Sequence, residues 1–266
     1  MPIARQDDAR FTRPRHLPGV ELVSAAYRDR GFPEHSHAET VVGAVVAGAE
    51  TLAVGGRSHV VGTGDVLRLH PNEPHANATI GDDTLRYRVL YLPEAAIRPF
   101  LDPARQSASF DTPVVSSPAM FRMVNAAHVA LSAGDTGLLE QESALAALVR
   151  AVADSGPAKR EIAAPATIAA ARNYIDSHYT EGFGLQTLTD LTGLSVFHLV
   201  RSFKKTVGLS PLAYRNQRRV MEARGRLLAG HSAVRVALDM GFADQSHFTR
   251  QFQRIVGTSP RRYAQQ

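Results

Sequence analysis

The chain of 266 residues is long enough for two modest domains, and its composition, 44% hydrophobic and 21% charged, is that of an ordinary globular protein. It holds no cysteine, which excludes disulfides, thiolate metal sites and cysteine nucleophiles. It also holds no apolar run of about eighteen residues that would cross a membrane, and its first residues lack the apolar stretch of a secretory signal. We therefore expect a cytoplasmic protein without a membrane partner.

The net charge of +5 is distributed unevenly along the chain. Residues 165–266 carry 14 Lys and Arg against 6 Asp and Glu, whereas residues 1–164 carry 16 against 19. A basic C-terminal part behind a slightly acidic N-terminal part indicates that only the C-terminal part meets a polyanion such as nucleic acid. A basic surface that is merely solvated explains the charge equally well, so charge alone does not decide.

The first 110 residues are predicted to form short β-strands. Residues 40–46 and 85–91 are rich in β-branched and aromatic side chains, and glycine-rich turns such as Gly55-Gly56 separate runs of this kind. Many short strands with closely spaced turns predict a barrel or a sandwich.

A group of polar residues stands out within this strand pattern. His35, His37 and Glu39 alternate, so we expect all three on one face of a strand, and His75 is expected to return to them after a turn at Pro71-Asn72. Three interpretations stay open. The group lines a pocket for a small-molecule effector, together with Tyr87; or His35, His37 and His75 hold a divalent transition metal; or the histidines are hydrogen-bonded inside a filled barrel.

From about residue 118 to residue 154 the apolar residues recur with a helical period. One stripe consists of Met120, Met123, Val124, Ala127 and His128, and a second consists of Leu138, Leu139, Leu145, Leu148, Val149 and Val152. The stripes either pair with a second subunit or pack on the N-terminal domain, and we expect a homodimer. Residues 155–160 follow as a charged, turn-rich linker.

The C-terminal part contains an internal repeat. Residues 195–211 align with residues 244–260 at an offset of 49, and 7 of the 17 aligned pairs are identical. Random matching would give roughly one identity. One structural unit therefore occurs twice.

Each copy predicts a capped helix followed by the start of another. Ser195 and Asp244 are good N-caps because their side chains accept hydrogen bonds from the free amides of the first turn. Gly208 and Gly257 suit a left-handed C-cap, after which a Ser-Pro pair begins a new helix in both copies.

A shorter helix and a tight turn precede each copy. Thr189 stands four residues before Gly193, and Ala237 stands four residues before Gly241. The small side chain lets two helices cross closely, and the glycine takes the turn between them. The pattern predicts two helix-turn-helix units, joined by a long helix over residues 212–229 that holds them at successive segments of the DNA major groove, about 34 Å apart.

The second helix of each unit, here called the reading helix, is expected to enter the major groove. Its buried face carries Leu199 and Phe203 in the first unit, and Phe248 and Phe252 in the second. The remaining faces offer the candidate DNA-binding residues, which are Phe197, Val200, Arg201, Lys204 and Lys205, and then Gln245, Ser246, Thr249, Arg250, Gln253 and Arg254.

The residue types indicate distinct roles at the DNA. Arginine forms hydrogen bonds with guanine, and glutamine forms them with adenine. Threonine and valine contact the thymine methyl group, whereas lysines and flanking arginines bind phosphates. Ion pairs within the protein are the alternative role for the charged side chains. His198 and His247, which match between the copies, are expected to pack or cap rather than to touch bases.

These residues resemble the DNA-binding domain of the AraC/XylS family. The resemblance covers residues from about 165 to 264 and rests on residues 193–195, 198–204, 208–211, 241–252 and 257–260, together with Arg219, Ala223, Leu227 and Leu228. It implies a seven-helix domain that regulates transcription, most often as an activator that contacts RNA polymerase. Val200 departs from the family pattern, in which a polar residue is more common. Over roughly residues 10 to 110, the histidine motifs resemble the cupin barrel that serves as sensor domain in such regulators.

The sequence thus predicts a two-domain α+β protein. A cupin-like, ligand-sensing β-barrel spans residues 1–110, a helical linker and dimerisation segment spans residues 111–164, and an all-α domain with two helix-turn-helix units spans residues 165–266.

The expected function is sequence-specific binding of double-stranded DNA to activate transcription under control of a small-molecule effector, without catalysis. The alternative is a metal-dependent cupin enzyme with a DNA-binding tail. A third hypothesis is DNA repair by methyl transfer, because one repair protein shares this type of helix-turn-helix. That reaction needs an acceptor thiol, which the chain lacks.

Overall fold

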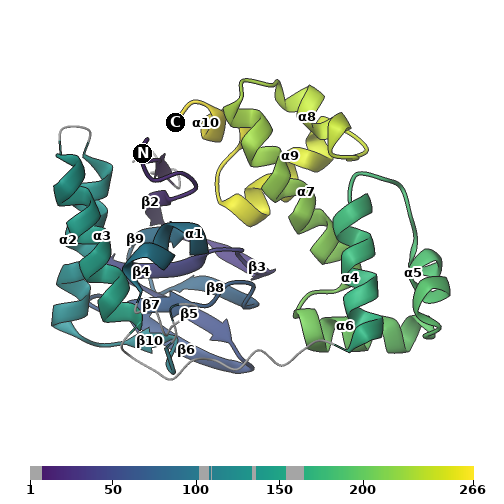
Figure 1. Cartoon of the computed structure of the whole chain (residues 1–266), viewed down its shortest axis with the longest axis horizontal. Coiled ribbons are helices and arrows are strands. Elements are labelled where there is room, and N and C mark those ends of the chain that lie inside the picture. The colour runs from purple at the N-terminus through teal and green to yellow at the C-terminus, as the bar shows by residue number, and fades with distance from the viewer. Residues whose placement is uncertain (1–7, 102–107, 109, 134–135, 154–164) are drawn as a thin grey trace. The chain divides into compact units, whose positions relative to one another are not determined.

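A computed structural model describes residues 8–101, 108, 110–133, 136–153 and 165–266 (Figure 1). The predicted linker at residues 155–160 lies outside this part of the chain. Backbone contacts divide the chain into two compact units, Met1–Gly31 with Ser36–Arg160, and Glu161–Gln266 with Phe32–His35. Because Phe32–His35 belongs to a strand that is hydrogen-bonded into a sheet of the first unit, it is described with that unit. The two are called the β-rich unit and the helical unit.

The β-rich unit contains two sheets. The strands are β1 (Asp8–Thr12), β2 (Glu21–Tyr27), β3 (Gly31–His35), β4 (Thr40–Ala47), β5 (Ala49–Val54), β6 (Arg57–Gly62), β7 (Val66–Leu69), β8 (His75–Ile80), β9 (Leu85–Leu92) and β10 (Val114–Val115). One sheet has the order β1-β2-β9-β4-β7-β10 and the other the order β3-β8-β5-β6. The described strands form two sheets rather than one closed barrel, an arrangement that fits a cupin-like jelly roll.

Local sequence explains the tight connection between β5 and β6. Val54 pairs with Arg57, so the hairpin loop has only the two residues Gly55 and Gly56. Both have positive φ, 58° and 75°, as the common two-residue hairpin turn requires, and glycine adopts such angles without strain.

The helices after the strands pack on the β-rich unit's own core. The short α1 (Glu94–Ile97) and the 3-10 turn η1 (Arg98–Phe100) precede α2 (Pro118–Ser132) and α3 (Leu138–Ala153). Val124 of α2 and Leu148 of α3 join Leu90 of β9 in one apolar cluster. Packing on the chain's own sheet therefore accounts for the buried parts of both predicted stripes. Leu138 and Leu139 of the second stripe are 52% and 78% exposed, so these two residues do not pack on the unit's own core.

The helical unit consists of two small bundles joined by a long helix. Its helices are α4 (Ala166–His178), α5 (Leu185–Thr192), α6 (Val196–Val207), α7 (Pro211–Leu228), α8 (Ala233–Asp239), α9 (Gln245–Val256) and α10 (Pro260–Ala264). Helices α4, α5 and α6 contact one another, α9 contacts α8 and α10, and α7 contacts members of both groups. Leu199 and Phe203 of α6 and Phe248 and Phe252 of α9 are fully buried, as predicted.

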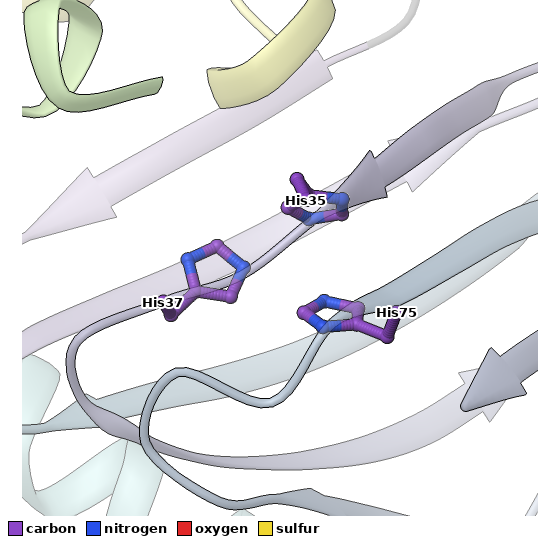
Figure 2. A group of neighbouring side chains, drawn as sticks. All are labelled: His35, His37 and His75. Carbon is purple, nitrogen blue, oxygen red and sulfur yellow. The ribbon is translucent and has the colours of Figure 1, made fainter. Parts of the chain in front are cut away.

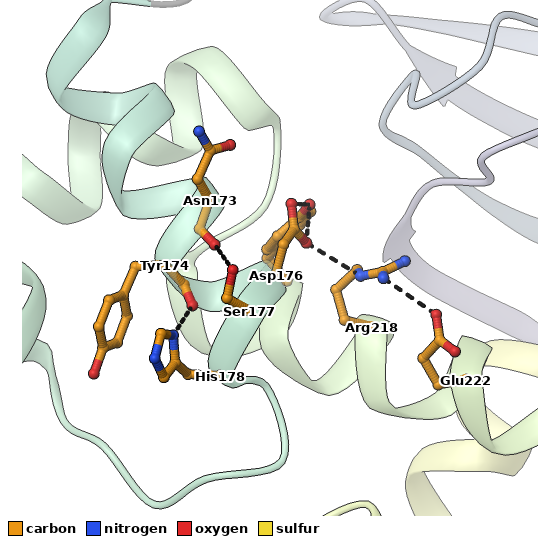
Figure 3. A network of polar contacts seen from close by, with 8 residues as sticks. Asn173, Tyr174, Asp176, Ser177, His178, Arg218 and Glu222 are labelled. Atoms are coloured by element: carbon orange, nitrogen blue, oxygen red, sulfur yellow. Dashed lines mark hydrogen bonds and ion pairs between the residues drawn. The ribbon is translucent and has the colours of Figure 1, made fainter.

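Polar side chains fasten α4 to α7. The carboxylate of Asp176 lies 3.1 Å from Nε of Arg218, and it accepts a hydrogen bond of 2.9 Å from the Tyr214 hydroxyl. Arg218 also reaches Glu222 one turn further along α7, at 3.1 Å (Figure 3). These contacts fix the first bundle on the connecting helix.

Arg219 ties the two bundles together. Its buried guanidinium donates hydrogen bonds to the carbonyl oxygens of Tyr179 and Glu181 after α4 and to that of Gly241 in the second unit's turn, the last at 2.7 Å. A buried arginine is stable only when its donors are satisfied in this way.

Within the described part of the chain, no helix is both long and apolar enough to cross a membrane.

Candidate nucleic-acid interface and ligand site

The first reading helix is α6, and its ends follow the predicted caps. The Ser195 side chain accepts a hydrogen bond from the backbone amide of His198, and Gly208 closes the helix with a φ of 85°. The turn that joins α5 to α6 passes through Gly193, whose φ is 69°. Helix α5, the turn at Gly193 and helix α6 therefore form a helix-turn-helix unit, and the capped N-terminal end of α6 is exposed to solvent.

The second reading helix, α9, has the same construction. The Asp244 side chain accepts a hydrogen bond of 2.7 Å from the amide of His247, and Gly257 closes the helix with a φ of 85°. Gly241 makes the turn after α8 with a φ of 73°. The internal repeat thus corresponds to a repeated three-dimensional unit.

Nine of the eleven predicted DNA-binding side chains are exposed, and Val200 and Thr249 are partly buried. Arg201 and Arg250 occupy matching positions on α6 and α9. Among the described residues neither forms an ion pair. The alternative role for these two arginines, pairing within the protein, is therefore not seen in the described part of the chain.

The two matched histidines have local roles. Nδ1 of His198 lies 2.9 Å from the Ser195 hydroxyl, so the ring extends the N-cap. The ring of His247 packs edge-on against Phe242, with centroids 5.5 Å apart. These are the capping and packing roles expected from the sequence.

The β-rich unit brings three histidines together. His35 ends β3, His37 follows it, and His75 begins β8, and all three side chains are buried (Figure 2). Each offers a ring nitrogen, and these nitrogens lie within 4.8 Å of one another. The predicted return of His75 to the other two is confirmed by this geometry.

Backbone hydrogen bonds orient two of the three rings. Nδ1 of His35 lies 2.8 Å from the carbonyl oxygen of Pro33, and Nδ1 of His75 lies 2.9 Å from that of Glu73. A carbonyl oxygen only accepts, so each Nδ1 carries the hydrogen and each Nε2 of the neutral ring keeps its lone pair. Burial lowers the pKa of His75 to about 4, which keeps this ring neutral.

The donor set fits a divalent transition metal. Neutral imidazoles with one nitrogen fixed by a backbone carbonyl are common ligands of such ions, because the carbonyl selects the tautomer that can coordinate. His35, His37 and His75 are the residues that would hold the ion.

One further residue of the predicted pocket, Glu39, lies differently from expectation. Strand β3 ends at His35, and Glu39 lies in a bend, so the expected strand alternation of His35, His37 and Glu39 was wrong. The chain turns after β3 to enter β4, and Glu39 is not part of the histidine group. Tyr87 lies on β9 with its ring 5.8 Å from that of Tyr27.

The sequence prediction missed a buried acid in the same unit. Glu50 on β5 is 1% exposed and accepts a hydrogen bond of 2.8 Å from the Asn77 side chain. Burial raises its pKa to about 7, and burial together with Tyr27 and Glu50 raises the pKa of Tyr87. The pattern that would have revealed it is the alternation of Glu50 with Leu52 and Val54, which places a carboxyl on the buried face of the strand.

Comparisons with known proteins agree with this geometry. The AraC-like ligand binding domain family matches residues 17–149, half of the chain, and a helix-turn-helix domain family matches residues 188–266. The chain belongs to the AraC/XylS family of transcriptional regulators. It is a DNA-binding regulator with an N-terminal ligand-binding domain.

Individual relatives support the assignment. The transcriptional regulator YbfI of Bacillus subtilis is 29% identical over 238 residues, which cover 84% of each chain. The transcriptional activator RhaS of Escherichia fergusonii is 34% identical over 93 residues, 35% of this chain and 34% of that protein. A structure of ToxT from Vibrio cholerae has the same fold, with a TM-score of 0.60 and 13% identity over 92% of this chain and 94% of that one.

Proposed function

We propose that this AraC-family regulator reads two successive major-groove segments of double-stranded DNA with α6 and α9. The observation that carries the proposal is the repeated unit itself, in which equal caps and glycine turns expose matching faces of the two helices. Arg219 and the Asp176–Arg218 pair attach both bundles to α7 and hold the readers in a fixed relation. A fixed spacing is what two adjacent half-sites require.

The side chains divide into base readers and phosphate contacts. We assign base contacts to Arg201 and Arg250, whose planar guanidinium groups suit guanine. Gln245, Ser246, Thr249 and Gln253 extend the base-reading face of α9. Lys204, Lys205 and Arg254, near the C-terminal ends of the reading helices, hold phosphates.

In the β-rich unit we propose an effector site at the group His35, His37 and His75, extended by Tyr87 and the carboxyl of Glu50. Buried polar groups of this kind orient a small polar molecule in an otherwise apolar interior. A divalent metal on the three imidazoles is one form of this site, because their ring nitrogens lie close together and the backbone hydrogen bonds of His35 and His75 select the tautomer that can coordinate. The metal would retain its positive charge among neutral ligands and so favour an anionic effector.

Effector binding alters DNA occupancy only when the effector prefers one state of the protein. We propose that the chain activates transcription, as its relative, the transcriptional activator RhaS, does. We further propose that it does so through contact with RNA polymerase, and that it forms a homodimer through the exposed Leu138 and Leu139 of α3. We propose no catalytic role, and because the partner is DNA, we place the site of action in the cytoplasm. The domain limits proposed are residues 1–110, 111–164 and 165–266.

The test is selection of binding sites from genomic DNA. The full chain, purified without chelators, is mixed with fragments of its own genome at near-physiological salt, and the retained DNA is sequenced. We expect a few sites upstream of genes, each with two short motifs about one helical turn apart. Recovery of random fragments, both from this sample and from one reloaded with Zn²⁺, would contradict the regulator proposal, and turnover of a substrate by that sample would favour the cupin enzyme.

A further inference from the structure

The surface of α6 carries an apolar strip at the position where a DNA reader normally presents polar groups. Phe197 is 66% exposed and Val196 is 46% exposed. Together with Val200 they line a shallow hollow whose remaining lining residues are the cations of the same helix, namely Arg201, Lys204 and Lys205. Exposed apolar groups gathered in one place usually mark a binding surface.

The matching positions on α9 are polar. Gln245 aligns with Val196, Ser246 with Phe197 and Thr249 with Val200. The repeat thus keeps the scaffold and changes the chemistry of its reading face. Side chains that neither donate nor accept hydrogen bonds read no donor or acceptor of a base pair.

We infer that the strip of Val196, Phe197 and Val200 binds the C5-methyl groups of thymines in the major groove. The thymine methyl is the apolar group that the base pairs present there, and the groove is bordered by phosphates on both sides. The strip has the complementary arrangement, an apolar centre with three cations beside it. The inference rests on the proposed entry of α6 into the major groove and adds which bases it selects.

The same charges argue against an apolar protein partner on this face. Burying the strip against such a partner would also bring Arg201 and Lys205 out of water without counter-charges, which is unfavourable. Duplex DNA supplies both the methyl groups and the negative charge. The α6 half-site is therefore expected to contain consecutive thymines beside a guanine bound by Arg201.

Deoxyuridine provides the direct test, because it removes the methyl group of thymine and leaves base pairing unchanged. In an operator obtained by the genomic selection, the thymines of one half-site at a time are replaced by deoxyuridine, and the Kd of the full chain is measured. In the α6 half-site we expect a loss of about fourfold per contacted thymine, the fold-change equivalent to burying one methyl group, about 0.8 kcal/mol. The α9 half-site is the control, in which Thr249 reaches one thymine at most.

A second experiment tests whether the preference for thymine over deoxyuridine depends on the strip. The variant Phe197→Ser, which installs the residue of α9, changes an exposed side chain and is expected to fold, as checked by circular dichroism. It should bind the thymine and the deoxyuridine operators nearly equally. The matched control, Leu238→Ser, changes an exposed apolar side chain of α8 outside both reading faces and should keep the full discrimination between thymine and deoxyuridine.

A third arm restores the methyl group on another base. Replacing a contacted thymine by cytosine should weaken binding, and 5-methylcytosine at that position should recover about fourfold. Equal binding of thymine and deoxyuridine in the α6 half-site, or discrimination that survives Phe197→Ser, would overturn the inference while leaving the regulator intact. Failure to obtain any operator would overturn the proposed function itself.

Discussion

The two helix-turn-helix units share a scaffold but differ in what they present to solvent and to their neighbours. Ser195 and Asp244 cap α6 and α9 in the same way, and Gly208 and Gly257 end them with the same φ of 85°. The reading faces differ, since Phe197 on α6 corresponds to Ser246 on α9. Caps and turns are set by backbone geometry, which tolerates few residue types, whereas an exposed face can vary without loss of the fold.

The units also differ in how tightly their turns are packed. A Cβ atom at Gly193 would meet nothing within 4 Å, but a Cβ atom at Gly241 would lie 2.1 Å from the carbonyl oxygen of Thr180 and 2.9 Å from the Arg219 guanidinium. The second turn is therefore the place where the connecting helix and the end of α4 meet the repeat. The first turn is an ordinary surface turn.

The largest expected effect comes from a substitution in the tightly packed second turn. Gly241→Ala should destabilise the helical unit by more than about 4 kcal/mol, because the methyl group collides with backbone that cannot move away. Gly193→Ala, the matched control, should cost about 1–2 kcal/mol for the left-handed backbone alone. Urea unfolding measures both losses, with amide exchange read in α8 and α9 for Gly241→Ala and in α5 and α6 for Gly193→Ala. Equal losses for the two variants would show that the second turn is not held as tightly as described.

The next effect concerns specificity at the DNA. Arg250→Ala should weaken binding to an operator by about 1–3 kcal/mol and relax the preference at one base pair of the α9 half-site. Arg201→Ala should do the same in the α6 half-site and leave the other unchanged. Competition binding against a library of single-base changes maps each loss. A variant that lowers affinity for every sequence alike would assign its arginine to phosphate instead.

The N-caps should respond equally in the two units. Ser195→Ala and Asp244→Ala should each cost about 1 kcal/mol, because each removes one hydrogen bond to a free amide at the start of a helix. Urea unfolding of the full chain, read by amide exchange in α6 and α9, compares them. A loss several times larger at one site would mean that its side chain has a further role.

The smallest expected effect is electrostatic. Lys204→Gln, which installs the residue found at this position in α9, should weaken binding to all DNA sequences alike. The slope of log K against log salt should fall by about one, because one counterion fewer is released. A salt titration with an operator and a scrambled duplex measures this. An unchanged slope, with loss confined to the operator, would make Lys204 a base reader.

The sequence predicted the helical unit well because its constraints are local. Caps, turn glycines and the buried phenylalanines recur within a few residues of one another, and the offset of 49 repeats them. The packing of Gly241 against Thr180 was not predictable, since 61 residues separate them and no local pattern records their approach.

The β-rich unit was predicted less completely. The histidine motifs indicated the group of His35, His37 and His75, but the end of β3 at His35 moved Glu39 away from it. Glu50 was overlooked because a single carboxyl in a strand resembles a solvent-facing residue until burial is known. Pairing between distant strands decides which face is buried, and this information is not local in the sequence.

The central claim is that the two reading helices are equivalent scaffolds whose exposed faces select different bases. Exchanging the face tests it most directly: Val196→Gln, Phe197→Ser and Val200→Thr together place the α9 residues on α6. The binding sites selected from a random DNA library by this variant and by the wild type are then sequenced. The account predicts that the first half-motif changes toward the second and that the second half-motif and the spacing persist. A first half-motif identical to that of the wild type would contradict it.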